Sequence, residues 1–389
     1  MLSARAAGAA AAGARPRLLL ITPDYPPAHG GIQTTAHRVA TGVTAMDTRV
    51  VALASAGAGA FDRGALSRGE AVAVRRAPSD PRLRGARNVA LNAVAMMDAL
   101  RFRPDVILSL HLVASPAAAA IRRALGARTV QYFHAKEIPA KARLAAFAAA
   151  QADVVVAVGA YTEGLIRATG APVAEMRRVS PGVDLPADPR PLPAERPTFV
   201  TVARLEDRYK GHDVLMRALA LVRERVPDVQ WAVIGEGPLR AELEELARAQ
   251  GVAGSVRFLG ALSDAQRDTW LRRARLLAMP SRLPAGARAG EGFGIVYTEA
   301  AAYGKPVVAG NVGGALDAVL DGQTGLLVDP ADPRAVGEAI ATLLLDFDLA
   351  QRLGRAGAQR AQEFAWPLVV GRLQEVLLEQ ADRARSARG

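Results

Sequence analysis

The feature that most constrains the fold of this chain is a series of short apolar runs, most of them separated by segments of helical periodicity. Apolar runs without polar alternation are typical of strands buried on both faces, which occur in parallel sheets covered by helices. The runs form two groups, at 17–22, 50–54, 71–74, 106–110, 129–133 and 154–158, and at 198–203, 231–235, 256–260, 276–280, 307–309 and 326–328. The sequence therefore predicts an α/β protein with two doubly wound, Rossmann-like sheets.

A proline-rich segment separates the two groups of runs. Prolines recur every few residues between 186 and 197, a spacing that neither a helix nor a central strand tolerates. A chain of 389 residues is also long enough for two domains with separate cores. We predict a disordered tail at 1–15, a first domain at 16–185, a linker at 186–197, a second domain at 198–365, and a C-terminal helix and tail at 366–389.

The amino-acid composition limits which chemistry the protein can perform and in which compartment we expect it. The chain contains no cysteine, which excludes disulfides, thiolate metal ligands and a cysteine nucleophile. The tail at 1–15 is too weakly apolar for a signal peptide, and no stretch has the run of about 18 apolar residues that a spanning helix needs. We therefore expect a cytoplasmic protein, with peripheral contact to the inner face of the cell membrane as a further hypothesis.

The net charge of +11 is confined to the first half of the chain. Residues 1–190 contain 24 Lys and Arg against 13 Asp and Glu, whereas residues 191–389 contain 25 of each class. Such asymmetry concerns partners rather than the fold. One early stretch carries Arg63, Arg68, Arg75, Arg76, Arg82, Arg84 and Arg87. We predict that it meets an anionic acceptor or membrane surface and that 82–87 is an exposed loop; the alternative is an arginine-rich composition decorating solvated surface.

The stretch from Glu291 to Glu299 carries the strongest functional signal. Two glycines follow Glu291, and helical periodicity from Ile295 ends at Gly304, a residue typical of helix C-termini. Bare backbone N–H groups at a helix N-terminus bind phosphate, and glycine lets the ligand approach closely. Carboxylates at such a site need neutral hydrogen-bond donors, which the hydroxyls of a sugar or ribose supply. The residues therefore indicate a nucleotide-sugar site.

The same stretch matches the E-x7-E motif of retaining glycosyltransferases of family 4, which have the GT-B fold. The residues 279–282 and 309–314 fit as well, and within the family the chain resembles bacterial mannosyltransferases of the phosphatidylinositol-mannoside type. The resemblance implies two domains facing a cleft, with the C-terminal helix crossing back to the first. It also implies transfer of a hexose to a lipid, glycan or small-molecule acceptor in cell-envelope biosynthesis, from GDP-mannose or, as the alternative, from a UDP-sugar.

The resemblance also implies roles for individual residues. The catalytic residues are expected to be His134, Arg204, Lys210 and Glu291, and the donor-binding residues Gly30, Gly31, Phe293, Gly294, Ile295 and Glu299. Arg204 and Lys210 would stabilise the leaving diphosphate, while Glu291 would hold hydroxyls of the donor sugar and Glu299 those of the ribose. With no side chain evident as a nucleophile, the resemblance implies a front-face reaction in which the leaving phosphate takes the proton of the acceptor.

No metal and no cofactor other than the donor substrate are expected. Cations and helix N-termini supply the charge that a divalent ion supplies in other enzymes. The triplet Asp346-Phe-Asp348 resembles a metal motif of a different glycosyltransferase fold, but it lies in a leucine-rich helical stretch and is interpreted as helix surface. Of two histidines that end strands, His111 is interpreted as structural. Asp213 is expected to cap the helix that follows it.

Other function classes fit less well. A glucosyl- or N-acetylglucosaminyltransferase with a UDP-sugar donor shares the site logic and stays the main alternative. A non-catalytic nucleotide-binding protein is a distant one. Nucleic-acid binding lacks interleaved aromatics, since aromatic residues are only 5% of the chain. A dehydrogenase lacks the Gly-x-Gly-x-x-Gly pattern after the first strand.

Overall fold

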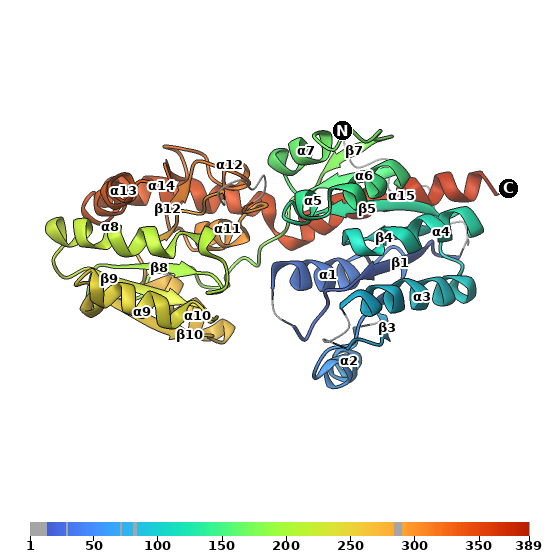
Figure 1. Ribbon diagram of the computed structural model, residues 1–389, viewed down its shortest axis with the longest axis horizontal. Helices are drawn as coiled ribbons and strands as arrows, with labels where there is room; N and C mark the ends of the chain where they lie inside the picture. The colour runs from blue at the N-terminus through green and yellow to red at the C-terminus, as the bar shows by residue number, and fades with distance from the viewer. Residues whose placement is uncertain (1–13, 29, 71, 81–83, 284–289, 389) are drawn as a thin grey trace.

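The computed structural model describes residues 14–28, 30–70, 72–80, 84–283 and 290–388, so almost all of the tail predicted at 1–15 lies outside the described residues. Two α/β domains lie side by side, the first on the right and the second on the left of Figure 1. Each is built on a parallel sheet covered by helices, which confirms the predicted fold class.

The first domain contains a sheet of order β3-β2-β1-β4-β5-β6-β7, in which all neighbouring strands are parallel. Its strands are β1 (Arg17–Thr22), β2 (Asp47–Leu53), β3 (Ala73–Ala77), β4 (Val106–Ser109), β5 (Arg128–Phe133), β6 (Val154–Ala157) and β7 (Met176–Arg178). Its helices are α1 (Gly31–Gly42), α2 (Ala58–Ser67), α3 (Arg84–Phe102), α4 (Ser115–Leu125), α5 (Glu137–Ala140), α6 (Ala142–Gln151) and α7 (Ala160–Arg167). The order reverses between β1 and β4, and sheets of this kind bind ligands beyond the carboxyl ends of the strands at such a point.

The second domain repeats the arrangement with a sheet of order β10-β9-β8-β11-β12-β13. Its strands are β8 (Thr198–Val202), β9 (Gln230–Ile234), β10 (Val256–Gly260), β11 (Leu276–Met279), β12 (Val307–Gly310) and β13 (Gly325–Val328). Its helices are α8 (His212–Arg225), α9 (Arg240–Ala249), α10 (Asp264–Arg273), α11 (Ile295–Ala302), α12 (Ala315–Ala318), α13 (Pro333–Leu345) and α14 (Phe347–Ala361). Here the order reverses between β8 and β11, so the loops after these two strands lie at the ligand-binding edge.

The last helix, α15 (Trp366–Ser386), joins the two domains a second time. It leaves the second domain and packs against α1, β4 and β5 of the first, as the long red helix in Figure 1 shows. The chain crosses at a point where Val183 pairs with Ala365, with the Val183 amide donating to the Phe364 carbonyl at 2.8 Å. Leu373 and Leu377 are buried there, so α15 completes the core of the first domain. The predicted crossover is confirmed.

The elements that differ from expectation lack a simple apolar signal. The strand expected at 71–74 lies at Ala73–Ala77, where exposed and half-buried residues alternate because it is a sheet edge. The short strand β7 was not predicted, since two of its three residues are arginine. Helix α2 was not predicted either; Ala58 is its one buried residue, and its glycine- and alanine-rich sequence contains no apolar run.

Three local predictions were wrong. Of the loop predicted at 82–87, residues 84–87 belong to α3, which begins at Arg84, and 82–83 lie outside the described residues. Asp213 does not cap α8, whose N-cap residue is Gly211; its carboxylate instead accepts two hydrogen bonds of 2.9 and 2.8 Å from Arg282. Asp346 does not lie inside a helix, because it caps α14 by accepting from the Leu349 amide at 2.8 Å.

Candidate active site

A cavity of about 290 Å³ opens between the domains, next to the loops that follow β1, β5 and β8. The structure gathers most of the predicted site there although the residues come from distant parts of the chain. The lining includes Gly30, Gly31, His134, Arg204, Lys210, Glu291, Phe293, Gly294 and Ile295. Of the predicted set, Glu299 lies one turn further along α11.

Glycine is required in the loop before α11 because backbone packs against backbone. A Cβ on Gly292 would lie 2.1 Å from the His134 carbonyl oxygen, and one on Gly314 would lie 2.1 Å from the Gly292 carbonyl oxygen. Gly294 has a φ of +86°, in the left-handed region that favours glycine. These contacts fix the course of the 291–294 loop against both the first domain and the 313–314 turn.

The N-terminus of α11 has the features of an anion site. Gly294 is the N-cap residue and no side chain caps the helix, so the first amides of α11 lack a side-chain acceptor. The loop of the first domain faces this helix closely, because a Cβ on Gly31 would lie 2.9 Å from Ile295 Cδ1. A phosphate at this position would therefore meet backbone from both domains.

Lys210 and Glu291 form an ion pair at the mouth of this loop. The Lys210 ammonium donates to Glu291 Oε2, and the two side chains are only 17% and 15% exposed. Burial alone would lower the pKa of Lys210, but the Glu291 carboxylate and the neighbouring Tyr209 outweigh it, and the pKa is raised above its usual range. The site therefore holds a charged lysine beside the uncapped N-terminus of α11.

Tyr209 lies between lysines of the two domains. Its ring centroid is 5.0 Å from Lys210 Nζ and 5.2 Å from Nζ of Lys136, which also pairs with Asp207 at 3.0 Å. Arg204 projects from the same 203–210 loop with its side chain 67% exposed and 3.3 Å from Glu206. Arg204 is thus an exposed cation at the cleft, whereas Lys210 is largely buried and paired with Glu291.

His134 emerges at the carboxyl end of β5, as predicted, and its ring is oriented by backbone. Its Nε2 lies 2.9 Å from the Leu110 carbonyl oxygen, which makes Nε2 the donor and leaves Nδ1 as the acceptor in the neutral ring. The His134 amide donates to Glu137 at 2.7 Å. By contrast, His111 uses Nδ1 to accept from the Val113 amide at 3.2 Å and caps the turn at 112–114, which is a structural role.

Glu299 faces Arg267 of α10. Arg267 Nη1 lies 3.6 Å from Glu299 Oε1, and the Glu299 side chain is 24% exposed. Burial raises the pKa of Glu299, which Arg267 opposes and the charges of Asp184 and Asp264 reinforce. Hydroxyl donors from a ribose would stabilise this carboxylate in its charged form.

Three residues of the site were missed at the sequence level: Asp24, Tyr209 and Arg267. Asp24 follows β1, and Gln33 Nε2 donates to its Oδ1 at 3.2 Å. Burial raises the pKa of Asp24, although the charges of His134, Arg87 and Arg204 oppose this, so Asp24 belongs to the same cluster. Its position at a strand end, the signal used for His134, could have identified it. Nothing in the sequence marked Tyr209 or Arg267.

The described residues contain no group of three or more His, Asp or Glu side chains arranged to hold a metal ion. In the same part of the chain, no helix combines the length and apolar character needed to cross a bilayer.

Two family models match consecutive parts of the chain. Glycosyltransferase Family 4 matches residues 29–186 and Glycosyl transferases group 1 matches residues 187–360. A GDP-mannose-dependent alpha-(1-6)-phosphatidylinositol monomannoside mannosyltransferase of Mycobacterium tuberculosis is 33% identical over 93% of this chain and 98% of its own length. Its counterpart in Mycolicibacterium smegmatis is 34% identical over 92% and 98%.

Solved structures show the same architecture at lower identity. Anabaena HepE, crystallised with UDP and glucose, gives a TM-score of 0.77 at 22% identity, covering 93% of this chain and 99% of that one. Sucrose-phosphate synthase from Thermosynechococcus elongatus gives 0.78 at 21% identity, covering 94% and 99%. With both domains matched in sequence and in fold, the chain belongs to the family 4 glycosyltransferases of the GT-B fold, enzymes that move a sugar from a nucleotide sugar to an acceptor.

Proposed function

We propose that this enzyme transfers mannose from GDP-mannose to a glycolipid acceptor with retention of the anomeric configuration. The observation that carries the proposal is the Lys210–Glu291 pair beside the uncapped N-terminus of α11, facing Gly30 and Gly31 across the cleft. The choice of donor and acceptor rests on the mycobacterial relatives, whose names specify GDP-mannose and a phosphatidylinositol monomannoside.

In this proposal each charged group has one task. The donor diphosphate lies at the N-terminus of α11, where Lys210 and Arg204 compensate the negative charge that grows as the sugar leaves. Glu291 accepts hydrogen bonds from sugar hydroxyls, and Glu299 accepts them from the ribose. Since Lys210 already donates to Glu291, the ion pair fixes the position of the sugar relative to the phosphate.

The reaction needs no protein nucleophile. The bond between the anomeric carbon and the β-phosphate oxygen breaks, and a bond from the acceptor hydroxyl oxygen forms on the same face of the sugar. The acceptor proton passes to the departing phosphate oxygen, giving GDP and the mannosylated acceptor. His134 lines the first-domain side of the cavity, where it contacts the sugar, and Asp24 lies close enough to feel the charge of His134.

The donor assignment is tested by turnover with a panel of nucleotide sugars. With a phosphatidylinositol monomannoside acceptor, we expect GDP-mannose to be used in preference to UDP-glucose and UDP-N-acetylglucosamine, and proton NMR of the product to show the α anomer. EDTA should change the rate by no more than about twofold, because protein cations carry the charge.

Each contrary result has a definite meaning. Preference for a UDP-sugar would replace the proposal by its main alternative, and an inverted product would remove the front-face reaction. Loss of activity with EDTA, restored by Mg²⁺, would show a metal-dependent reaction. Nucleotide binding without turnover on any acceptor would support the distant alternative, a non-catalytic nucleotide-binding protein.

The basic surface of the first domain is only partly free to meet an anionic partner. Arg76 is 13% exposed and holds Asp62 at 2.7 Å, and Arg75 lies 3.5 Å from Asp98. Arg87 is half-buried, and its charge acts on Asp24 and His111, so it faces inward. On α2 and the turn after it, Arg63 and Arg68 are exposed beside Leu66, which is 63% exposed, and Arg68 also pairs with Glu70 at 2.9 Å. We infer that this α2 face meets the anionic surface from which a lipid acceptor is taken.

Replacing Arg63 and Arg68 by serine should weaken binding to anionic vesicles about thirtyfold at low salt, because each basic residue near such a surface contributes about 1 kcal/mol. Co-sedimentation with phosphatidylserine-containing vesicles measures this. The control replaces Arg352 and Arg355, which are exposed on α14 of the second domain, and should bind like wild type. Equal binding by all three proteins, or equal binding to neutral vesicles, would contradict the inference.

A further inference from the structure

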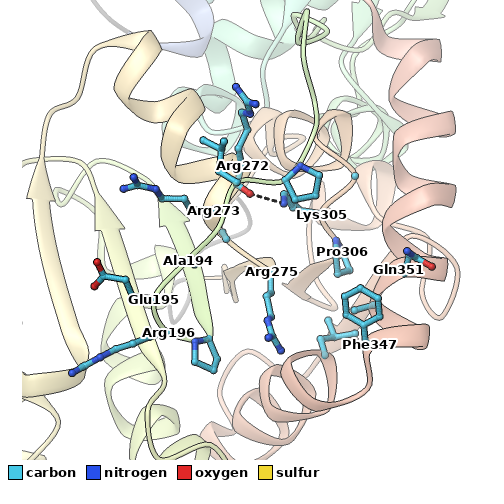
Figure 2. A pocket seen from close by; sticks show the side chains of 17 residues that line it. Ala194, Glu195, Arg196, Arg272, Arg273, Arg275, Lys305, Pro306, Phe347 and Gln351 are labelled. Atoms are coloured by element: carbon cyan, nitrogen blue, oxygen red, sulfur yellow. Dashed lines mark hydrogen bonds between the residues drawn. The ribbon is translucent and has the colours of Figure 1, made fainter.

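A second cavity, of about 410 Å³, lies in the second domain away from the interdomain cleft. It opens where β8, β11 and β12 begin, which is the opposite edge of the sheet from the donor site. The linker residues 191–197 form one wall and α14 forms another, and Figure 2 shows the side chains around it. Pro191, Pro197, Pro306 and Phe347 give much of the lining an apolar character.

One buried cation reaches this cavity. Lys305, in the turn between α11 and β12, is 5% exposed, and its Nζ donates to the Arg272 carbonyl oxygen at 3.0 Å, the dashed contact in Figure 2. An ammonium group carries three donors. Within the described residues this carbonyl is its one hydrogen-bond acceptor, and no carboxylate forms an ion pair with it.

Of the four arginines around the cavity, three have partners of their own, and the fourth, Arg196, is exposed on the linker. Arg272 binds Asp188 and the Arg190 carbonyl, each at 2.9 Å, and approaches Asp268 at 3.7 Å. Arg275 donates to the Leu344 carbonyl at 2.7 Å, and Arg273 lies over the Trp270 ring at 5.9 Å. In Figure 2 these three side chains point in different directions.

The charge on Lys305 therefore lacks compensation. Burial lowers its pKa to about 8, and the charge of Arg272 adds to this effect. The one carboxylate in the lining is that of Glu195, an exposed linker residue on the opposite side of the cavity from Lys305 in Figure 2. A bound anion is the group that would both fill the free donors of Lys305 and neutralise it.

We propose that this cavity binds a small monocarboxylate with an apolar body, its carboxylate on Lys305 and its body against the linker prolines and Phe347. Lys305 is the buried cation of the lining, and it matches the single negative charge of a carboxylate. The volume lies within the range of roughly 300–1,000 Å³ that small-molecule sites occupy, and such sites combine apolar walls with few polar anchors. The ligand would touch the segment that connects the two domains.

Titration calorimetry with sodium octanoate tests the proposal on the full-length protein. Because the carboxylate binds the protonated lysine, octanoate should bind about tenfold more weakly at about pH 9 than at about pH 7. In buffers of different ionisation enthalpy, binding at about pH 9 should be accompanied by uptake of close to one proton. Octan-1-ol, which has the same body without the charge, should show neither effect.

Two variants of Lys305 and one control variant test where octanoate binds. Lys305→Met should weaken octanoate binding by about tenfold or more and abolish its pH dependence, since removing a charge partner costs at least about 1.4 kcal/mol. Lys305→Gln, which keeps the donor to the Arg272 carbonyl, should behave alike and guards against misfolding of the first variant. Arg273→Met removes an exposed cation from the same rim and should bind octanoate within about twofold of wild type.

Nucleotide-sugar turnover and the thermal unfolding curve of each variant serve as the test of folding, because Lys305 lies outside the donor site. Octanoate binding that is equal in wild type and Lys305→Gln would overturn the proposal. So would binding of the wild type that is independent of pH, or binding that Arg273→Met weakens as much as Lys305→Met does.

Discussion

Replacing Glu291 by glutamine is expected to lower kcat by roughly a hundred- to thousandfold, the usual loss when one electrostatic contact to a developing charge is removed. The fold should survive, since Glu291 lies in a cleft rather than in a core. Lys210→Ala should show a loss of similar size, because the same ion pair is broken from its other side. Steady-state kinetics with saturating donor and acceptor measure both.

The glutamine variant should also change the pH dependence of the residual activity. In the wild type, Glu291 keeps the pKa of Lys210 raised despite burial. Without the carboxylate, Tyr209 alone opposes the effect of burial and the pKa of Lys210 falls, so Lys210 loses its proton at a lower pH and activity falls earlier as pH rises. Glu242→Gln breaks the exposed Arg208–Glu242 pair near the same loop and should leave both rate and pH profile unchanged. Wild-type kinetics in Glu291→Gln would remove this pair from the site.

Gly314→Ala is expected to lower kcat about a hundredfold through displacement of the 291–294 loop. Gly314 has an ordinary helical φ of −71°, so alanine is not strained by its own backbone conformation. The damage is steric: the new methyl group would lie 2.1 Å from the Gly292 carbonyl oxygen and 2.4 Å from the Phe293 amide nitrogen. Both atoms must move, and they belong to the loop that presents Glu291 and the N-terminus of α11.

A second glycine provides the matched control. Gly371 lies within α15, and a Cβ there would have no neighbour within 4 Å. Gly371→Ala should keep full activity and raise the free energy of unfolding by about 0.5–1 kcal/mol, because alanine has the higher helix propensity. If Gly314→Ala were as active as Gly371→Ala, the close packing of the 292 and 314 backbones would not be what places the donor.

Most strands of the two sheets were predictable because their burial follows from the local run of apolar residues. A fully apolar run such as Leu18–Ile21 has few alternatives to a covered parallel strand. The edge strand β7 and helix α2 were not predicted, because many of their residues face solvent and their sequences contain no continuous apolar run. Strands could therefore be predicted wherever the apolar run was continuous, and they were missed where it was interrupted.

The residues of the site were predictable only where a sequence motif or the end of a predicted strand marked them. Glu291 and Lys210 were each expected at the cleft, but their pairing joins positions 81 residues apart and depends on how two loops meet. The contact of Arg267 with Glu299 and those of Tyr209 with two lysines also depend on how separate segments meet. Such contacts are set by tertiary packing, which sequence spacing does not record.

The return of α15 to the first domain has a consequence for the order in which the molecule is made. The first domain emerges from the ribosome first, yet the side chains of Leu373 and Leu377 that seal its core lie near the end of the chain. At roughly 5–20 residues per second, the ribosome takes roughly 10–40 s to pass from Val183 to α15. Throughout that interval the apolar face that α15 will cover stays open to water or to a chaperone. The domain that is synthesised first is therefore the one completed last, and premature termination within the final helix would leave it without a finished core.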